Sequence, residues 1–298
     1  MRILLVGRTG QVGWELERSL SPLGELIAID RARLDLSDPE AIRQTMRSVR
    51  PEWIVNAAAY TNVDGAEDDG ATAFAINCGA PEAMAQEARR LGAALIHYST
   101  DYVFDGTKPD PYVESDATAP LNVYGRSKLA GEEAIRASGA GYLILRTSWV
   151  YASRGKNFLR TILRLAGERE VLRVVDDQFG APTWARFIAE VTAAMLWRAR
   201  FDASARERIE RGETVHLANG GSTTWCGFAR KAIALYAQRT GARLATVEAI
   251  AASAYPTKAV RPRNSRLDLT RLTRDWTIAA PDWEDSLALC VDEIAVRQ

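Results

Sequence analysis

A glycine-rich turn close to the N-terminus limits the possible folds more than any other feature of the sequence. The apolar run RILLVG precedes it, and an amphipathic stretch follows it. Glycine lets the backbone turn tightly and approach a ligand, while the free amides and the dipole of a helix N-terminus attract phosphate oxygens. A strand, this turn and a helix in that order predict a dinucleotide-binding βαβ unit. The spacing is Gly-x-x-Gly-x-x-Gly, and the candidate phosphate-binding residues are Gly7, Gly10, Gln11, Val12 and Gly13.

Short apolar runs alternate with amphipathic stretches through the first half of the chain. The runs are nearly continuous in apolar character, which is typical of parallel strands covered on both faces. The alternation predicts an α/β fold, a Rossmann-like doubly wound parallel sheet with a smaller C-terminal α/β region that binds substrate. The predicted strands are RILLVG, ELIAID, WIVNAAA, ALIHYST and YLILRTS, and the predicted helices are residues 11–20, 39–49, 71–91 and 124–138.

The second half of the chain is less regular. We expect a dinucleotide-binding domain over residues 1–150, joined by parts of residues 171–200, and a mainly substrate-binding region over residues 151–298. The predicted helices of this half are residues 157–166, 187–200, 227–240 and 283–296, and the apolar runs VLRVV and TVHLAN lie between them.

Charge, hydropathy and cysteine content exclude several classes of protein. The chain has 38 basic and 38 acidic residues, so no net charge attracts nucleic acid or an anionic membrane. The first apolar run is too short for a signal peptide or a membrane span, which predicts a cytoplasmic protein. Cys78, Cys226 and Cys290 fit neither a disulfide framework nor a zinc cluster, and we interpret them as buried thiols. His97 and His216 lie in apolar runs, where packing is the ordinary explanation.

Charged residues at the end of the second predicted strand bear on the choice of cofactor. Asp30 ends the run ELIAID, where a carboxylate can accept hydrogen bonds from an adenosine ribose. Arg31 and Arg33 follow at once and could instead pair with a 2′-phosphate. The residues therefore leave both NADH and NADPH open, and a solvated turn residue is the alternative interpretation of Asp30.

The run YGRSK at the start of a predicted helix contains a candidate catalytic pair. Tyr124 and Lys128 are four residues apart, which places the phenol and the ammonium on one helical face. A nearby cation lowers a tyrosine pKa from its usual value of about 10, so that Tyr124 could give a proton to a carbonyl oxygen as hydride reaches the carbon. Lys128 could also bind the nicotinamide ribose. Thr100, at the end of a predicted strand, could hydrogen-bond the same carbonyl oxygen. An exposed pair without chemistry is the alternative interpretation.

Several stretches closely resemble one known family over essentially the whole chain. GRTGQVGWEL, IVNAAAYTNVDGAE, HYSTDYVFDG, APLNVYGRSKLAGE, RTSWVY, VVDDQFGAPT and RPRNSRLD resemble the dTDP-4-dehydrorhamnose reductases of the extended short-chain dehydrogenase/reductase family. The resemblance implies reduction of dTDP-4-dehydro-L-rhamnose by NADPH or NADH, the last step in making dTDP-L-rhamnose for cell-surface polysaccharide. It also implies that Tyr124 is the proton donor, that Lys128 tunes Tyr124 and binds the nicotinamide ribose, and that Thr100 orients the keto oxygen.

The same resemblance implies further binding residues. An indole suits the apolar face of a deoxyhexose, and arginine and amide groups suit phosphate oxygens, although core packing and surface charge remain alternative interpretations. Besides the glycine turn, the implied cofactor contacts are Asp30, Asp35, Leu36, Ala59, Tyr60, Thr61, Tyr98, Tyr124 and Lys128. The implied substrate contacts are Thr100, Asp101, Trp149, Arg261, Asn264 and Arg266. No compact carboxylate cluster indicates a metal site, so none is predicted.

Other functions share this fold. Sugar-nucleotide 4,6-dehydratases carry an Asp-Glu pair after the corresponding threonine, whereas Tyr102 follows Asp101 here. A 4-epimerase would show a serine-rich segment at this point. The regulatory subunit of methionine adenosyltransferase also resembles these reductases and binds a protein partner, although Tyr124, Lys128 and Thr100 are all present in this chain. We expect a nucleotide-sugar reductase that is a monomer or a homodimer.

Overall fold

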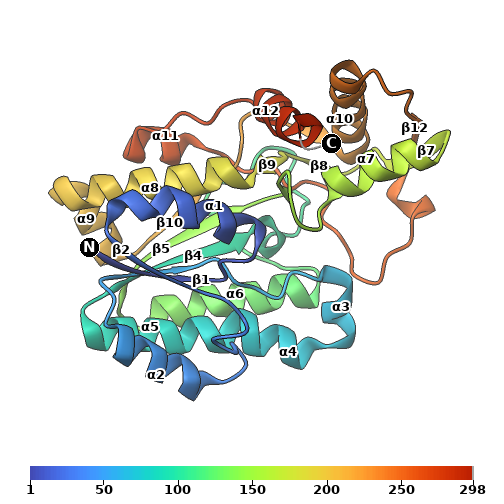
Figure 1. The fold of residues 1–298 in the computed structure, drawn as a ribbon. Coiled ribbons are helices and arrows are strands. Elements are labelled where there is room, and N and C mark those ends of the chain that lie inside the picture. The colour runs from blue at the N-terminus through green and yellow to red at the C-terminus, as the bar shows by residue number, and fades with distance from the viewer. Residues whose placement is uncertain (297–298) are drawn as a thin grey trace.

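A single parallel sheet forms the centre of the computed structural model, which describes residues 1–296 (Figure 1). The strand order is β10-β5-β4-β3-β1-β2, and all neighbouring strands are parallel. The predicted doubly wound parallel sheet is therefore confirmed. Its strands are β1 (Arg2–Val6), β2 (Glu25–Ile29), β3 (Trp53–Asn56), β4 (Ala94–Thr100), β5 (Gly141–Thr147) and β10 (Glu213–His216).

Helices cover both faces of the sheet (Figure 1). α1 (Gln11–Leu20) and α8 (Ala185–Phe201) lie on one face and pack together, while α2 (Pro39–Val49), α5 (Ala80–Leu91) and α6 (Val123–Ala137) lie on the other. The central strands are consequently buried on both sides, which explains their continuous apolar sequence. The bounds of α1 and α2 coincide with the predicted helices at residues 11–20 and 39–49. Asp38 begins α2 by accepting hydrogen bonds from the amides of Glu40 and Ala41 at 2.9 and 3.1 Å.

The predicted helix at residues 71–91 is interrupted. α4 (Gly70–Phe74) and α5 are joined by η2, a π-helical turn at Ala75–Gly79. Within this turn the buried Asn77 side chain bonds both backbone groups of Tyr60, at 2.9 and 3.0 Å, and the Ser127 hydroxyl at 3.0 Å. The turn thus ties the segment after β3 to α6, and π turns of this kind often occur at functional sites.

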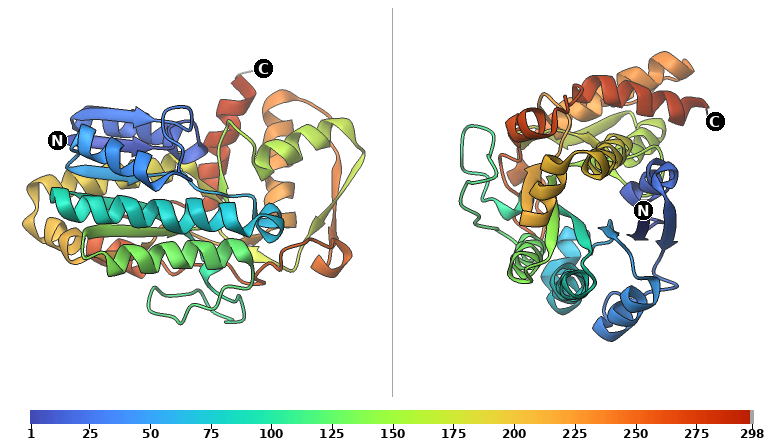
Figure 2. Two further views of the ribbon diagram at one scale, coloured as in Figure 1. Left: turned by 90° about the horizontal axis from the view of Figure 1, so that it is seen from below. Right: turned by 90° about the vertical axis from the view of Figure 1, so that its left-hand side faces the viewer.

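The second half of the chain contributes both to the central sheet and to a separate layer outside it. β10 extends the central sheet and α8 covers it, whereas β7 (Val171–Val175) and β12 (Thr246–Ile250) form a separate parallel pair beside α10 (Trp225–Thr240). Figure 2 shows this second layer at one end of the sheet. The domain boundary at residue 150 stays a prediction. The remaining elements are η1 (Ser21–Leu23), α3 (Val63–Asp68), η3 (Asp101–Val103), β6 (Val150–Tyr151), α7 (Phe158–Glu168), β8 (Phe179–Gly180), β9 (Thr183–Trp184), α9 (Ala203–Arg211), β11 (Thr223–Thr224), η4 (Ala252–Ala254), α11 (Thr270–Trp276) and α12 (Trp283–Val296).

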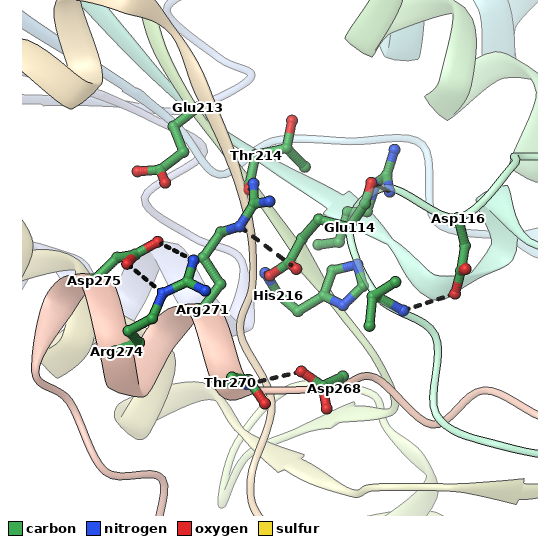
Figure 3. Close-up of polar contacts among 12 residues, drawn as sticks. Glu114, Asp116, Glu213, Thr214, His216, Asp268, Thr270, Arg271, Arg274 and Asp275 are labelled. Atoms are coloured by element: carbon green, nitrogen blue, oxygen red, sulfur yellow. Dashed lines mark hydrogen bonds and ion pairs between the residues drawn. The ribbon is translucent and has the colours of Figure 1, made fainter.

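An ion-pair network lies at the edge of the sheet beside β10 (Figure 3). A Glu114 carboxylate oxygen accepts the backbone N–H of His216 at 3.0 Å, and the other lies 3.6 Å from Arg271 Nε. Arg274 pairs with Asp275 at 2.7 Å. Burial lowers the pKa of His216 to about 3, so the imidazole is neutral. The network connects the loop after η3 to β10 and α11, and has a structural role.

In the described part of the chain, residues 1–296, we find no helix with the length and apolarity needed to span a membrane.

Candidate active site

A cavity of about 500 Å³ lies at the carboxyl ends of the sheet strands. It opens between β1 and β3, where the strand order reverses, which is the usual ligand site of an open parallel sheet. Most of the predicted cofactor residues surround it. Those lining the cavity are Gly7, Gly10, Gln11, Val12, Asp30, Asp35, Leu36, Ala59, Thr61, Tyr98, Tyr124 and Lys128.

The glycine turn at one side of the cavity is shaped by close backbone contacts. Gly7 has φ +90°, a conformation that favours glycine, and the Gly10 amide donates to the Gly7 carbonyl at 3.0 Å. A Cβ on Gly13 would lie 2.0 Å from the Gly7 carbonyl oxygen, so no larger residue fits where α1 meets the turn. The turn can therefore bring a ligand's phosphates close to the N-terminus of α1.

Charged groups stand at the outer end of the cavity. Asp30 and Arg31 line it, whereas the exposed Arg33 does not. Asp30 accepts the Ala32 amide at 3.1 Å. Asp35 accepts the amide and hydroxyl of Ser37, and the Ser37 amide is the largest of the contacts that lower the Asp35 pKa. This end can thus receive a ribose at Asp30 or a phosphate at Arg31.

Tyr124 and Lys128 occupy the inner end of the cavity together with Ser99 and Thr147. The Thr100 side chain lies against Tyr124, although Thr100 does not line the cavity. Burial raises the pKa of the Tyr124 phenol above its usual value, and the Thr100 hydroxyl only partly opposes this effect. Tyr124 is therefore protonated at neutral pH, the form needed to give up a proton. The prediction that Lys128 lowers this pKa is wrong, because the loss of hydration on burial dominates the shift.

Lys128 is almost completely buried in the wall of the cavity, with 1% of its surface exposed. Nζ donates to the backbone carbonyl of Tyr98 at 2.6 Å and lies 3.1 Å from His97 Nε2. Burial lowers the pKa of Lys128 to about 8, while the charge of Glu132 opposes the shift. Loss of hydration therefore makes proton release from Lys128 easier than from an exposed lysine.

Asp101 comes directly after Thr100 in the chain and begins η3. Its Oδ1 accepts the Thr100 hydroxyl at 3.0 Å, and burial raises the pKa of Asp101 to about 6. The backbone of Tyr60 is held by Asn77, and Tyr60 does not line the cavity. Gly13 does not line it either, because it lies in the first turn of α1 against the Gly7 carbonyl. These positions support the site without forming its wall.

Trp149 has an unusual conformation beyond the end of β5. Its φ is +47°, and its indole stacks on Trp225 with centroids 3.6 Å apart and an interplanar angle of 9°. A Cβ on Gly180 would lie 2.5 Å from Trp149 Cε2, so glycine leaves the space that the indole fills. A sugar could therefore contact only the part of the Trp149 indole that Trp225 does not cover.

The three residues predicted to bind the diphosphate lie outside the cavity wall. Arg261 pairs with Asp64 at 2.7 Å. The buried Asn264 donates to the carbonyl oxygens of Lys108 and Asp110, and its own oxygen accepts from Arg266. Asn264 thus holds two chain segments together, and a diphosphate contact at these residues stays a prediction. Across residues 1–296 no group of three or more His, Cys, Asp or Glu side chains could hold a metal ion.

Comparison with known proteins decides the family. A family model described as the RmlD substrate binding domain matches residues 1–296. Curated dTDP-4-dehydrorhamnose reductases from Burkholderia thailandensis and Escherichia coli strain K12 are each 47% identical over 300 residues, covering 99% of this chain and 99% and 98% of theirs. The chain belongs to the dTDP-4-dehydrorhamnose reductase family. The predicted enzyme class, an NAD(P)-dependent oxidoreductase, is thereby confirmed.

Solved structures of the reductase family share the whole fold. A reductase from Bacillus anthracis, in complex with NADP, is 33% identical with a TM-score of 0.87, over 98% of this chain and 99% of that chain. A reductase from Clostridium acetobutylicum is 31% identical with a TM-score of 0.88, over 99% of both chains. A Thermus thermophilus UDP-glucose 4-epimerase, 19% identical over 99% of both chains with a TM-score of 0.77, shares the fold alone.

Sequence reasoning missed several polar residues at this reductase site. Ser99 and Thr147 line the cavity beside Tyr124, and Lys156 lines it from the loop before α7. Two further polar residues lie behind Lys128: His97, for which the sequence predicts packing alone, and Asn56, for which it predicts no role. The sequence did contain one signal for Asn56 and His97. Each lies within an apolar strand, where a buried polar side chain needs a hydrogen-bonding partner.

Proposed function

We propose that the protein reduces dTDP-4-dehydro-L-rhamnose to dTDP-L-rhamnose with NADPH or NADH, as the last step of dTDP-L-rhamnose synthesis. One observation carries the proposal: Tyr124 and Lys128 line the inner end of a glycine-lined cavity, and the Thr100 side chain lies against Tyr124. The names of relatives that are 47% identical support the choice of sugar nucleotide. The Bacillus anthracis reductase in complex with NADP supports the choice of cofactor.

The residues of the cavity suit a nicotinamide dinucleotide. The backbone of Gly7 and Gly10 would face the pyrophosphate at the N-terminus of α1. Asp30 would bind the adenosine ribose, Arg31 would favour a 2′-phosphate, and Lys128 would bind the nicotinamide ribose. The hydride for the carbonyl carbon is the chemistry that bound NADPH or NADH supplies.

Gly13→Ala is expected to weaken binding of NADPH and NADH about ten- to hundredfold. The added Cβ would meet the Gly7 carbonyl oxygen at 2.0 Å, so the turn must open, and such overpacking costs about 1–3 kcal/mol. Dissociation constants from quenching of tryptophan fluorescence check this result. Gly167→Ala is the matched control, because a Cβ on Gly167 meets nothing within 4 Å. Equal affinities in both variants would contradict the assignment of the turn.

The chain's own groups supply the proton and the orientation for ketone reduction. The Tyr124 phenol gives its proton to the carbonyl oxygen as the carbon receives hydride, which yields the alcohol. The Thr100 hydroxyl, which lies beside Tyr124, orients that oxygen. Lys128, one helical turn after Tyr124, stabilises the phenolate that remains when its amine is protonated. These roles explain why the three side chains gather at one end of the cavity.

Trp149→Ala is expected to raise KM for the sugar nucleotide about three- to tenfold, because an aromatic contact contributes about 0.5–1.5 kcal/mol. The dissociation constant for NADPH should stay unchanged, since Trp149 does not line the cofactor cavity. Steady-state kinetics and a cofactor titration check both parts. Trp197→Ala is the control, because Trp197 is 50% exposed on α8. Equal weakening of sugar and cofactor binding would assign Trp149 a structural role.

The decisive assay follows nicotinamide absorbance while purified protein is mixed with dTDP-4-dehydro-L-rhamnose and either NADPH or NADH. Oxidation of the cofactor and recovery of dTDP-L-rhamnose are expected. A product of different stereochemistry at C4 would assign another 4-ketoreductase activity. Absence of oxidation by folded protein that still binds the cofactor would overturn the proposal and favour a non-catalytic, partner-binding role.

A further inference from the structure

A chain of buried polar side chains runs from the middle of the sheet to Lys128. Asn56 ends β3 and is paired in register with His97 on β4, and both are fully buried. Asn56 Nδ2 lies 3.2 Å from His97 Nδ1, and His97 Nε2 lies 3.1 Å from Lys128 Nζ. The imidazole is therefore in contact with a lysine of the active site on one side and with a buried amide on the other.

The orientation of Asn56 determines the direction of these hydrogen bonds. Asn56 Oδ1 accepts the Ala58 N–H at 3.2 Å, which turns the amide NH2 group toward His97. An amide NH2 group only donates, so His97 Nδ1 accepts and the proton of the neutral ring is on Nε2. His97 Nε2–H then points at Lys128 Nζ, and only the lone pair of a neutral amine can accept it.

The charged form of Lys128 does not match His97 in this arrangement. An ammonium has three donors and no acceptor, so it would need the other tautomer of His97, with a lone pair on Nε2. That tautomer would place Nδ1–H against the NH2 group of Asn56, donor against donor. Burial keeps the pKa of His97 well below its usual value, so the ring does not become an imidazolium instead.

Other groups around Lys128 do not remove this preference. Glu132, one turn further along α6, raises the pKa of Lys128, but its carboxylate is already held by Arg146 at 2.7 and 2.9 Å. Tyr124, one turn earlier, is a neutral phenol, and the Asp101 carboxyl acts on Tyr124 from η3. Lys128 also donates to the Tyr98 carbonyl, which either form of the amine can do. The hydrogen bond from His97 thus acts in the same direction as burial, toward the neutral amine.

We propose that Asn56 and His97 are positioning residues that favour the neutral amine of Lys128, because Asn56 fixes the His97 imidazole in its Nε2–H tautomer. The inference rests on the proposed role of Lys128 beside Tyr124. A neutral amine stabilises a phenolate less than an ammonium does. The Asn56–His97 pair therefore sets the pH at which reduction slows as the solution becomes more basic.

Nuclear magnetic resonance tests the tautomer without any turnover. In 15N-labelled protein, long-range correlations between ring nitrogens and carbon-bound ring protons distinguish Nε2–H from Nδ1–H. The chain has 2 histidines, so a His216→Gln spectrum assigns the signals, and Asn56→Asp assigns them independently by moving only those of His97. The Nε2–H tautomer is expected for His97 in the wild-type protein. An Nδ1–H tautomer would overturn the proposal and leave the proposed reaction untouched.

Asn56→Asp tests the link to Lys128. The new carboxylate would accept Nδ1–H, leave a lone pair on Nε2, and so favour the ammonium. The basic limb of the kcat–pH profile should move upward by about 1 pH unit or more, as expected for a nearby carboxylate. Asn62→Asp makes the same change at an exposed helix cap and should leave the limb in place. An unmoved limb in folded, active Asn56→Asp enzyme would show that the pair does not act on Lys128.

Discussion

Tyr124→Phe is expected to lower kcat about 10²- to 10⁴-fold, the usual contribution of a positioned general acid. The hydroxyl is the only group removed, and it lies at the inner end of the cavity beside the Thr100 side chain. Burial holds the phenol in its protonated form, so the wild-type residue is ready to give a proton to a ketone. Phenylalanine keeps the ring and its edge contact with Tyr102 but has no proton to give.

Stopped-flow and steady-state rates with saturating cofactor and sugar nucleotide measure this loss. The dissociation constant for NADPH and the melting temperature should remain at their wild-type values, which separates lost chemistry from lost folding. Tyr255→Phe removes a hydroxyl from a side chain that is 60% exposed and should leave kcat unchanged. Turnover of Tyr124→Phe at the wild-type rate would remove Tyr124 from the mechanism.

Glu132→Gln is expected to lower the free energy of unfolding by about 3–5 kcal/mol, the usual cost of leaving one member of a buried ion pair alone. The Glu132 carboxylate is fully buried and binds Arg146 through both oxygens, at 2.7 and 2.9 Å. Only 3% of the Arg146 side chain is exposed, so water cannot hydrate the guanidinium that loses its carboxylate partner. The pair joins α6 to β5 directly behind the catalytic pair on the same helix.

Urea unfolding of the wild-type and variant proteins measures the difference. Glu168→Gln is the control, because its pair with Arg164 is 52% and 60% exposed on the two sides and such pairs contribute about 0–1 kcal/mol. Burial raises the pKa of Glu132, but Arg146, Ser99 and Arg136 together outweigh burial and the pKa is lowered below its unfolded value. The stabilisation is therefore present at neutral pH and is lost as the pH falls through the folded pKa. A loss for Glu132→Gln no larger than for Glu168→Gln would contradict this account.

Local sequence was sufficient to predict most strands and helices of the first half of the chain, but not α3 or the π-helical turn that interrupts residues 71–91. The helix at residues 39–49 has its own N-terminal cap at Asp38, and the helix at residues 11–20 follows directly from the glycine turn. Apolar runs predicted the strands because parallel strands are buried on both faces. Tyr124 and Lys128 could be paired for a similar reason, since residues four apart on a helix share a face.

The sequence by itself determined the strand–turn–helix order, the glycine cradle and the helical pair, because each depends on neighbours within a few residues. Tertiary structure alone decided that β10 joins the sheet, that a π turn ties Asn77 to Tyr60, and that Trp149 stacks on Trp225. It also brought His97 on β4 into contact with Lys128 on α6. These contacts join residues distant in the chain, and they depend on how whole strands and helices pack together, which no local pattern encodes.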